Sequence, residues 1–235
     1  MAPSNEWDDY ATIYPQIDNE LEVPVLLRTA LSLVPGRRLV DVGCGEGGLL
    51  DAVRDELGDA WDLTGFEISA QRGHRARERG HNVFVSEDGV VPLPDCSMDV
   101  VTSTHVVEHV PDDAGYVREM ARLTRPGGVV YIETPLKLKG AWYFRHNHEG
   151  GWVLDPTHLR EYRSSDEVHR LLDRAGLKLL AEDVTRISYP LVAAEDVLLR
   201  LLKRPQRTGR PNGLRAARIN IPRYRQLAVL AQKPA

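Results

Sequence analysis

Two groups of residues in this 235-residue chain have types and spacing suited to chemistry: a glycine-rich turn near residue 45 and a histidine cluster that begins at residue 105. The turn follows a short apolar run at residues 39–42 and reads Gly43-Cys44-Gly45-Glu46-Gly47-Gly48. Glycines let the backbone turn sharply and approach a ligand closely, and the helix expected next presents unpaired amide groups to a polar ligand. The turn therefore predicts a cofactor site.

The spacing of the glycines alone does not identify the cofactor. Gly43, Gly45 and Gly48 also satisfy the dinucleotide-binding pattern, and Glu67 lies about where a ribose-binding acid belongs. A nucleotide-cofactor oxidoreductase is therefore one alternative. A tight turn that binds nothing is another, disfavoured because four glycines in six residues carry a large entropic cost unless the site is used.

The histidine cluster reads His105-Val106-Val107-Glu108-His109, and at helical or turn spacing residues 105, 108 and 109 share one face. Histidine is the natural general base near neutral pH. A third histidine, His158, lies in a later segment at residues 155–162. We predict catalytic roles for His105, His109 and His158. A hydrogen-bond network that only holds the turn is the alternative for residues 108 and 109, and a structural link between a loop and the sheet is the alternative for His158.

Strands and helices that would position these residues alternate along the chain, which is typical of a doubly wound, mostly parallel seven-stranded sheet covered by helices. The strands are expected at residues 39–42, 62–66, 82–85, 98–103, 129–133, 177–184 and 224–230. The helices are expected near residues 20–34, 48–57, 70–79, 112–124 and 165–175. Gly80 and Gly176 mark two helix ends, because glycine favours the left-handed conformation there.

The whole chain, residues 1–235, is expected to form one domain, since its composition of 42% hydrophobic and 27% charged residues is that of an ordinary globular protein. Its expected parts are N-terminal cap helices at 1–35, a cofactor-binding half at 36–135, and a lid or substrate loop at 136–162. A C-terminal half at 163–235 contains a basic, turn-rich connection at 204–223.

Four segments resemble motifs of the class I S-adenosylmethionine-dependent methyltransferases, a family with a Rossmann-like fold, and the match runs over most of the chain. Residues 41–47 resemble the first motif, whose glycines cradle the methionine part of the cofactor, and residues 65–69 resemble the second, whose acid accepts both ribose hydroxyls. Residues 92–101 and 123–132 resemble the approaches to the family's fourth and fifth strands. The resemblance is to small-molecule enzymes of the ubiquinone O-methyltransferase type.

This resemblance implies that S-adenosyl-L-methionine is the cofactor and that a methyl group passes to an oxygen, or less favourably a nitrogen, of a small-molecule acceptor. Glu87 or its neighbour Asp88 is expected to contact the adenine amino group, and Tyr14 belongs to a helix that covers the cofactor or packs on the core. The full set of implied cofactor contacts is Tyr14, Asp41, Gly43, Gly45, Gly47, Glu67, Ile68, Glu87, Asp88 and Thr104.

Residues 105–109 also resemble a Glu-x-x-Glu-His segment that binds a divalent metal in ubiquinone-pathway O-methyltransferases and in small-RNA 2′-O-methyltransferases, which add a later histidine. Here His105 replaces the first glutamate. A His-Glu-His-His set suits a transition metal, but the more usual family role of this segment is cofactor and substrate contact. We therefore assign no metal ligand from the sequence. A metal-assisted RNA 2′-O-methyltransferase and a non-catalytic methyltransferase-like binding protein remain alternatives.

Charge is divided unevenly along the chain. The net charge is −4, but the first 196 residues carry −14 and the rest +10. The basic part is either a solvated surface or a site for an anionic partner, such as RNA or an anionic surface. The apolar residues at 190–203 are expected either to pack on the sheet or to form a surface that faces a second copy of the chain, in a homodimer, or a membrane.

Two cysteines are too few for a disulfide framework, which favours a reducing compartment. The first residues do not resemble a secretion signal, and no apolar run reaches the ~20 residues that span a bilayer. A cytoplasmic protein without a transmembrane segment is the expectation.

Overall fold

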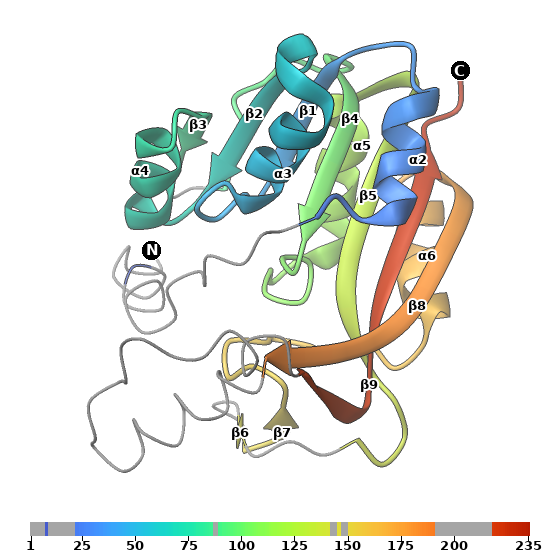
Figure 1. The fold of residues 1–235 in the computed structure, drawn as a ribbon. Helices are drawn as coiled ribbons and strands as arrows, with labels where there is room; N and C mark the ends of the chain where they lie inside the picture. Colours follow the sequence, from blue (N-terminus) through green and yellow to red (C-terminus); the bar gives the residue numbers. More distant parts are fainter. Residues whose placement is uncertain (1–7, 9–21, 87–88, 142–144, 147–149, 191–217) are drawn as a thin grey trace.

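The computed structural model describes residues 8, 22–86, 89–141, 145–146, 150–190 and 218–235, which build a seven-stranded sheet (Figure 1). The strand order is β3-β2-β1-β4-β5-β9-β8. The first five strands in this order pair in parallel, whereas β9 is antiparallel to both β5 and β8. The strands are β1 (Arg38–Val42), β2 (Asp62–Glu67), β3 (Asn82–Val85), β4 (Met98–Thr104), β5 (Thr124–Lys137), β8 (Lys178–Pro190) and β9 (Arg218–Gln232).

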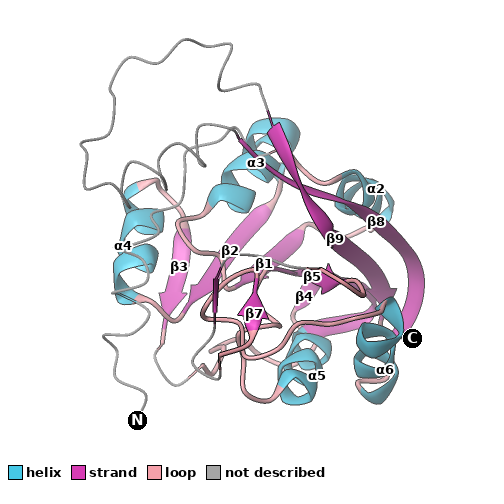
Figure 2. Ribbon diagram, turned by 90° about the horizontal axis from the view of Figure 1, so that it is seen from below, coloured by secondary structure: helices cyan, strands magenta, loops and turns pink. Residues whose placement is uncertain are grey.

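Helices cover both faces of the sheet (Figure 2). The α2, α3 and α4 helices share one apolar core with the sheet, and α5 and α6 share the other. The helices are α2 (Val25–Leu33), α3 (Gly48–Leu57), α4 (Ala70–Glu78), α5 (Asp113–Leu123) and α6 (Ser165–Arg174), with a 3-10 turn, η1, at Gly58–Ala60. The doubly wound fold class is thereby confirmed.

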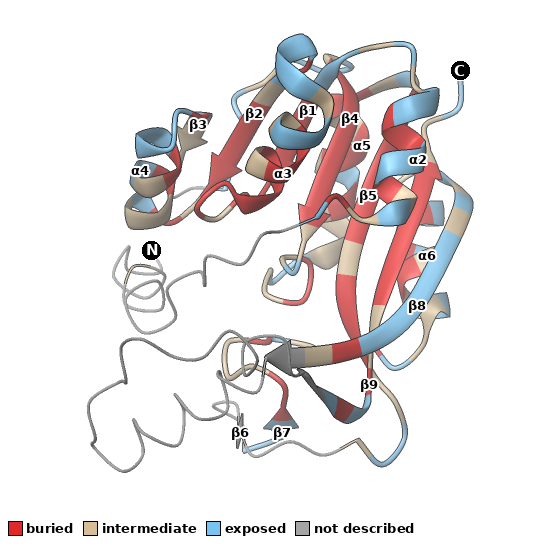
Figure 3. Ribbon diagram, viewed as in Figure 1, coloured by how far each residue is buried: buried red, intermediate tan, exposed pale blue. Residues whose placement is uncertain are grey.

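Burial on both faces explains why the central strands do not show the alternation of apolar and polar residues that is typical of a strand with one exposed face. In β4, every residue from Met98 to Ser103 is buried, and only Thr104 at the end is partly exposed (Figure 3). A parallel strand covered by helices on both faces needs this pattern. The predicted left-handed conformation at the helix ends is also confirmed, since Gly80 and Gly176 have φ angles of 87° and 72°.

The last strand starts six residues earlier than the expected start at residue 224. The β9 strand begins at Arg218, inside the segment that we expected to be a turn-rich connection up to residue 223. Its pairing with β8 shifts register between Arg186 and Ser188, and Arg223 has a left-handed φ of 58°. A bulge of this kind accommodates Pro222, which cannot donate a ladder hydrogen bond.

The expected lid at residues 136–162 begins as strand, because β5 extends to Lys137. Later in this segment, β6 (Arg145–His146) and β7 (Trp152–Val153) form a separate two-stranded sheet. Residues 142–144 and 147–149 lie outside the described residues, so a covering role for this segment stays a prediction.

None of the helices in the described parts of the chain combines the length and the apolar character that crossing a membrane requires. Most of the basic connection and all of residues 191–203 lie outside the described residues. The anionic partner, the homodimer and the cytoplasmic location therefore stay predictions.

Candidate active site

The carboxyl ends of β2, β1 and β4 meet at one edge of the sheet, where the strand order reverses. The β1 strand leads into the glycine turn, β2 ends at Glu67, and β4 ends at Thr104 directly before His105. In open α/β sheets, ligands bind outside the carboxyl ends of the strands at such a reversal. The topology thus brings the glycine turn and the histidine cluster to one edge of the sheet.

Glycine is required in the turn both by the backbone conformation and by packing. Gly43, Gly45 and Gly47 have left-handed φ angles of 83°, 57° and 84°. A Cβ added at Gly43 would lie 2.3 Å from Cγ2 of Val106, and one at Gly47 would lie 2.6 Å from Cδ2 of His81. The turn therefore packs directly against the segment that carries the histidine cluster.

Glu67 joins the end of β2 to this turn. Its buried carboxylate accepts hydrogen bonds from the amide nitrogens of Gly45 at 2.7 Å, Ile68 at 3.0 Å and Ser69 at 2.9 Å. A carboxylate has about four acceptor positions, so a further donor can still be accommodated. The structure thus brings together Gly45, Glu67 and Ile68, which the sequence analysis assigned to the cofactor.

Asp41 lies near the end of β1 and is fully buried. The hydroxyl of Thr102 on β4 donates to its Oδ1 at 2.8 Å. Burial, only partly offset by this hydrogen bond, raises the pKa of Asp41 to about 7. The carboxyl group is therefore partly protonated near neutral pH in the absence of a cationic neighbour.

His105 occupies a strained position immediately after β4. Its φ is 56°, a left-handed conformation uncommon outside glycine, and its amide donates to the carbonyl of Glu133 at 2.9 Å. Its side chain is half exposed, with Nδ1 3.4 Å from Oε1 of the buried Glu108. Desolvation works against charge on the ring, but the Glu108 and Glu133 carboxylates outweigh it and raise the pKa of His105.

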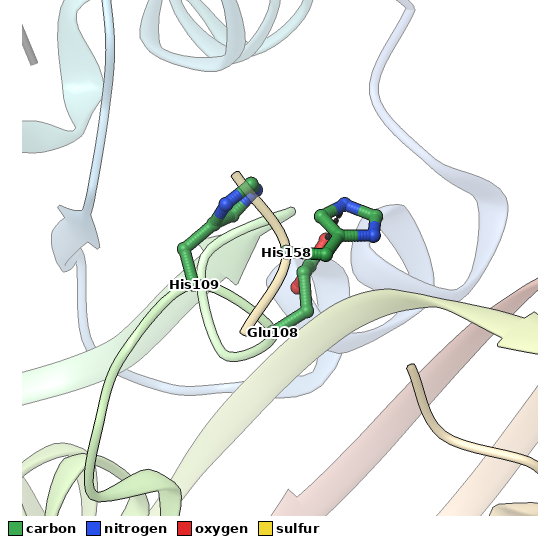
Figure 4. A group of neighbouring side chains, drawn as sticks. All are labelled: Glu108, His109 and His158. Atoms are coloured by element: carbon green, nitrogen blue, oxygen red, sulfur yellow. Dashed lines mark ion pairs between the residues drawn. The ribbon is translucent and has the colours of Figure 1, made fainter. Parts of the chain in front are cut away.

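Glu108, His109 and His158 form a cluster whose potential ligand atoms lie within 4.8 Å of one another (Figure 4). Oε2 of Glu108 accepts a hydrogen bond from the hydroxyl of Thr134 at 3.0 Å, while Oε1 makes no hydrogen bond within the described residues. His158 Nε2 is 3.9 Å from this Oε1, and the two imidazole rings pack edge to face, 4.8 Å between centroids. The structure thus joins two histidines that are distant in the sequence.

Electrostatics keep Glu108 ionised and His109 neutral. Burial disfavours the Glu108 charge, but the approach of His105, His109 and His158 holds its pKa below the ordinary value. Burial, together with the nearby His158, lowers the pKa of His109. A buried carboxylate among imidazoles can bind a cation, or it can fix the orientation of a histidine that accepts a proton.

Glu161, a buried carboxylate that supports His158, was not among the site residues predicted from the sequence. It lies 3.3 Å from Nδ1 of His158 and 2.8 Å from Nζ of Lys137, and it accepts hydrogen bonds from the Leu154 amide at 2.6 Å and the Tyr224 hydroxyl at 3.1 Å. The three-residue spacing between His158 and Glu161 could have indicated that the two side chains are close. The partners of Glu161 on β5 and β9 are distant in the sequence, so no local pattern indicates them.

Three of the sequence-assigned cofactor contacts, Tyr14, Glu87 and Asp88, lie outside the described residues. Thr104 lies at the end of β4 and pairs with Glu133 on β5, beside His105. A cofactor contact by Thr104 stays a prediction.

A family model described as a methyltransferase domain matches residues 17–182. The chain belongs to this methyltransferase family. The resemblance to class I S-adenosylmethionine-dependent methyltransferases is thereby confirmed, and the observed sheet is the fold of that class.

Individual relatives agree with this assignment. The chain is 33% identical over 162 residues to a probable S-adenosylmethionine-dependent methyltransferase of Mycolicibacterium smegmatis, covering 68% of this chain and 58% of the relative. It is 32% identical over 157 residues to a ubiquinone biosynthesis O-methyltransferase of Idiomarina loihiensis, covering 62% of this chain and 63% of the relative. The matched region thus spans about six-tenths of the length of these curated relatives.

The fold is also similar to that of a solved S-adenosylmethionine-dependent methyltransferase from Methanosarcina mazei. The TM-score is 0.62 at 14% sequence identity, over 91% of this chain and 99% of the other. At this identity the likeness concerns the fold alone.

The residues at this edge of the sheet fit S-adenosylmethionine. The glycine turn has no Cβ at its three left-handed positions, residues 43, 45 and 47, and the buried Glu67 carboxylate adjoins it through the Gly45 amide. An ionised acid suits a pair of ribose hydroxyl donors. The donor set Glu108, His109 and His158 also fits a divalent metal, because its potential ligand atoms lie within 4.8 Å of one another.

Proposed function

We propose that this chain is an S-adenosylmethionine-dependent methyltransferase that transfers a methyl group to an oxygen of a small-molecule acceptor. The observation that carries the proposal is the placement of the glycine turn, with Glu67, beside the histidine cluster at one edge of the sheet. The similarity to a ubiquinone biosynthesis O-methyltransferase supports an oxygen acceptor.

When bound, S-adenosylmethionine supplies an electrophilic methyl group on a sulfonium. The glycine turn and Glu67 would hold the cofactor at the ends of β1 and β2, and the acceptor would lie at the end of β4. Alignment of this kind is worth ~7–11 kcal/mol in well-positioned systems. An acceptor hydroxyl that receives this methyl group would have to lose its proton, so the site would need a proton acceptor beside it.

We assign the proton acceptor to His105, which is half exposed at the end of β4. With Nδ1 toward Glu108, the ring would carry its proton on Nδ1 and present a lone pair on Nε2. Among the histidines that the sequence analysis named, His109 and His158 are more buried around Glu108 and would support this site from behind.

The experiment is methyl transfer from methyl-labelled cofactor to a panel of hydroxylated small molecules, followed by mass spectrometry. The expected result is a product that gains one methyl group together with S-adenosylhomocysteine. His105→Ala should lower kcat by ~10²–10⁴-fold, the usual contribution of a general base, without changing cofactor affinity. His169→Ala is the control, because His169 pairs with Glu182 on β8 at 2.8 Å, away from the cluster.

Three results would contradict parts of this proposal. A chain that binds the cofactor but methylates no acceptor would be the non-catalytic binding protein. A methyl group found on nitrogen would overturn the oxygen acceptor. An unchanged kcat in His105→Ala would remove the base assignment.

A further inference from the structure

The histidine segment, residues 105–112, connects β4 to α5 and is neither helix nor strand. It carries the proposed base, His105, near its start. Its own backbone closes one turn, in which the His109 amide donates to the Val106 carbonyl at 2.8 Å. Carbonyl groups outside regular structure need donors from elsewhere in the fold. The position of this segment therefore depends on the side chains that donate to it.

One guanidinium group, that of Arg160, donates to three carbonyl groups of the histidine segment. Nη1 donates to the carbonyls of Val107 at 3.3 Å and Val110 at 2.6 Å, and Nη2 donates to the carbonyl of Pro111 at 2.7 Å. A guanidinium presents five donors in a rigid, planar fork, so it can hold several carbonyls in one geometry. The fork fixes the backbone both before and after Glu108 and His109.

Arg160 is itself anchored to regular elements. Its Nε lies 3.5 Å from Oδ2 of Asp113, the first residue of α5, and the Tyr162 hydroxyl donates to the same oxygen at 3.0 Å. Tyr162 forms a bridge with Leu136 on β5, and its carbonyl accepts from the Lys137 amide at 2.7 Å. Arg160 thus connects the histidine segment to both α5 and β5.

His105 needs this support because its backbone is strained, with a φ of 56°. A residue other than glycine keeps such a conformation only where the surrounding structure over-determines it. One restraint is the hydrogen bond from the His105 amide to the Glu133 carbonyl at 2.9 Å. The contacts of Arg160, which begin two residues later at Val107, restrain the backbone on the other side.

We propose that Arg160 is a positioning residue for methyl transfer, whose guanidinium holds the histidine segment so that His105 is oriented to accept the acceptor's proton. This inference rests on the proposed function, because it concerns the same histidine. The backbone amides of Leu159 and Arg160 also donate to the Glu108 carbonyl, at 3.0 and 3.3 Å, and replacing the Arg160 side chain leaves these two donors in place. A side-chain variant therefore tests the guanidinium alone.

The first measurement separates kcat from cofactor binding in Arg160→Ala. We expect kcat at saturating cofactor to fall roughly 10–100-fold, because a displacement of about 1 Å at the reacting groups can cost ~10²-fold. The affinity for S-adenosylmethionine, measured by calorimetry, should stay close to that of the wild type, because the glycine turn and Glu67 are unchanged.

Arg122→Ala is the matched control. Arg122 also donates to loop carbonyls, those of Leu93 at 2.9 Å and Val91 at 3.2 Å, and its side chain is 30% exposed, against 26% for Arg160. These carbonyls precede β4 rather than follow it. Arg122→Ala should lower the melting temperature to a similar extent but leave kcat at saturating cofactor unchanged, which separates positioning from a general loss of stability.

Amide hydrogen exchange of residues 105–112 is the second measurement and needs no acceptor. In Arg160→Ala this segment should exchange at least ~10-fold faster than in the wild type, because hydrogen bonds to a charged donor oppose local opening. Arg122→Ala should exchange there as the wild type does. Arg160→Lys keeps the charge without the fork, so it should change in the same directions by less, and it replaces Arg160→Ala if that variant fails to fold.

A folded Arg160→Ala variant with wild-type exchange over residues 105–112 would overturn the proposal, whether or not an acceptor is methylated. So would faster exchange with an unchanged kcat, or a loss of kcat in Arg122→Ala as large as that in Arg160→Ala. A wild type that methylates no acceptor would instead contradict the proposed function, and exchange would still decide whether Arg160 holds the segment.

Discussion

At the carboxyl edge of the sheet, the surroundings of single residues control whether their side chains are charged. Asp41 is the clearest case, because burial raises its pKa to about 7, against 3.8 in an unfolded chain. Ser103 and Tyr116 lie nearby, and the Tyr116 hydroxyl donates to the Val42 carbonyl at 3.0 Å, so the end of β1 is also fixed by side chains from β4 and α5. Buried polar side chains, as well as the glycines themselves, thus fix the position of the glycine turn.

Replacing Asp41 by Asn should make the stability of the cofactor-free chain less dependent on pH. Below about pH 4 both states are protonated, so Asp41 has no effect; as pH rises toward about 7 only the unfolded state ionises, and stability is progressively lost. Asp41→Asn should therefore melt at a higher temperature than the wild type at about pH 8 and at a similar temperature at about pH 4.

Thermal melts across this pH range check the prediction. Asp62→Asn, at an exposed position at the start of β2, is the matched control and should leave the profile unchanged. A parallel pH profile for Asp41→Asn and the wild type would show that the raised pKa is wrong.

Gly43 is predicted to tolerate alanine much less well than another left-handed glycine. Alanine at either Gly43 or Gly80 adopts a positive φ, at ~1–2 kcal/mol. Only at Gly43 does the Cβ clash with Val106, while nothing lies within 4 Å at Gly80. Gly43→Ala should therefore lose ~1–3 kcal/mol more in the free energy of unfolding.

Denaturant unfolding of the two variants measures this difference. The double variant Gly43→Ala/Val106→Ala should recover part of the loss, because it removes the contacting methyl groups. Equal losses in Gly43→Ala and Gly80→Ala would mean that the turn can move away from the histidine segment.

At the scale of elements, most strands and helices could be predicted because their patterns are local. The α3 helix at Gly48–Leu57 and β3 at Asn82–Val85 have the expected bounds. The start of β9 was missed because its residues up to 223 contain turn-forming types, and only pairing with β8 makes them strand. The same holds for the site. The glycine turn and the histidines are local motifs that can be recognised in the sequence, whereas the role of Glu161 depends on contacts with β5 and β9 that only the fold brings about.

The α5 helix depends on an N-cap that a single substitution removes. Asp112 accepts a hydrogen bond from the Gly115 amide at 2.8 Å. Asp112→Ala should destabilise the protein by ~1 kcal/mol, measured by thermal or denaturant unfolding. Asp112→Asn retains the acceptor and should remain close to the wild type. If both variants lost the same free energy, the cap hydrogen bond would not be the cause.

At the scale of the whole molecule, the acidic part of the sequence, up to residue 196, supplies every strand of the seven-stranded sheet except β9, which belongs to the basic part. Most of the basic part lies outside the described residues, so the anionic partner stays a prediction. The cofactor-binding edge, by contrast, is formed by described residues of β1, β2 and β4. The central claim therefore concerns this edge.

Calorimetric titration of S-adenosylmethionine into the full chain tests that claim most directly. We expect one cofactor per chain, with affinity at least about tenfold weaker in Glu67→Ala, a loss of ~1.4 kcal/mol, because the charged acceptor for the ribose is gone. Glu78→Ala, on the exposed side of α4, should bind as the wild type. Heat with NADH but none with millimolar S-adenosylmethionine would contradict the account.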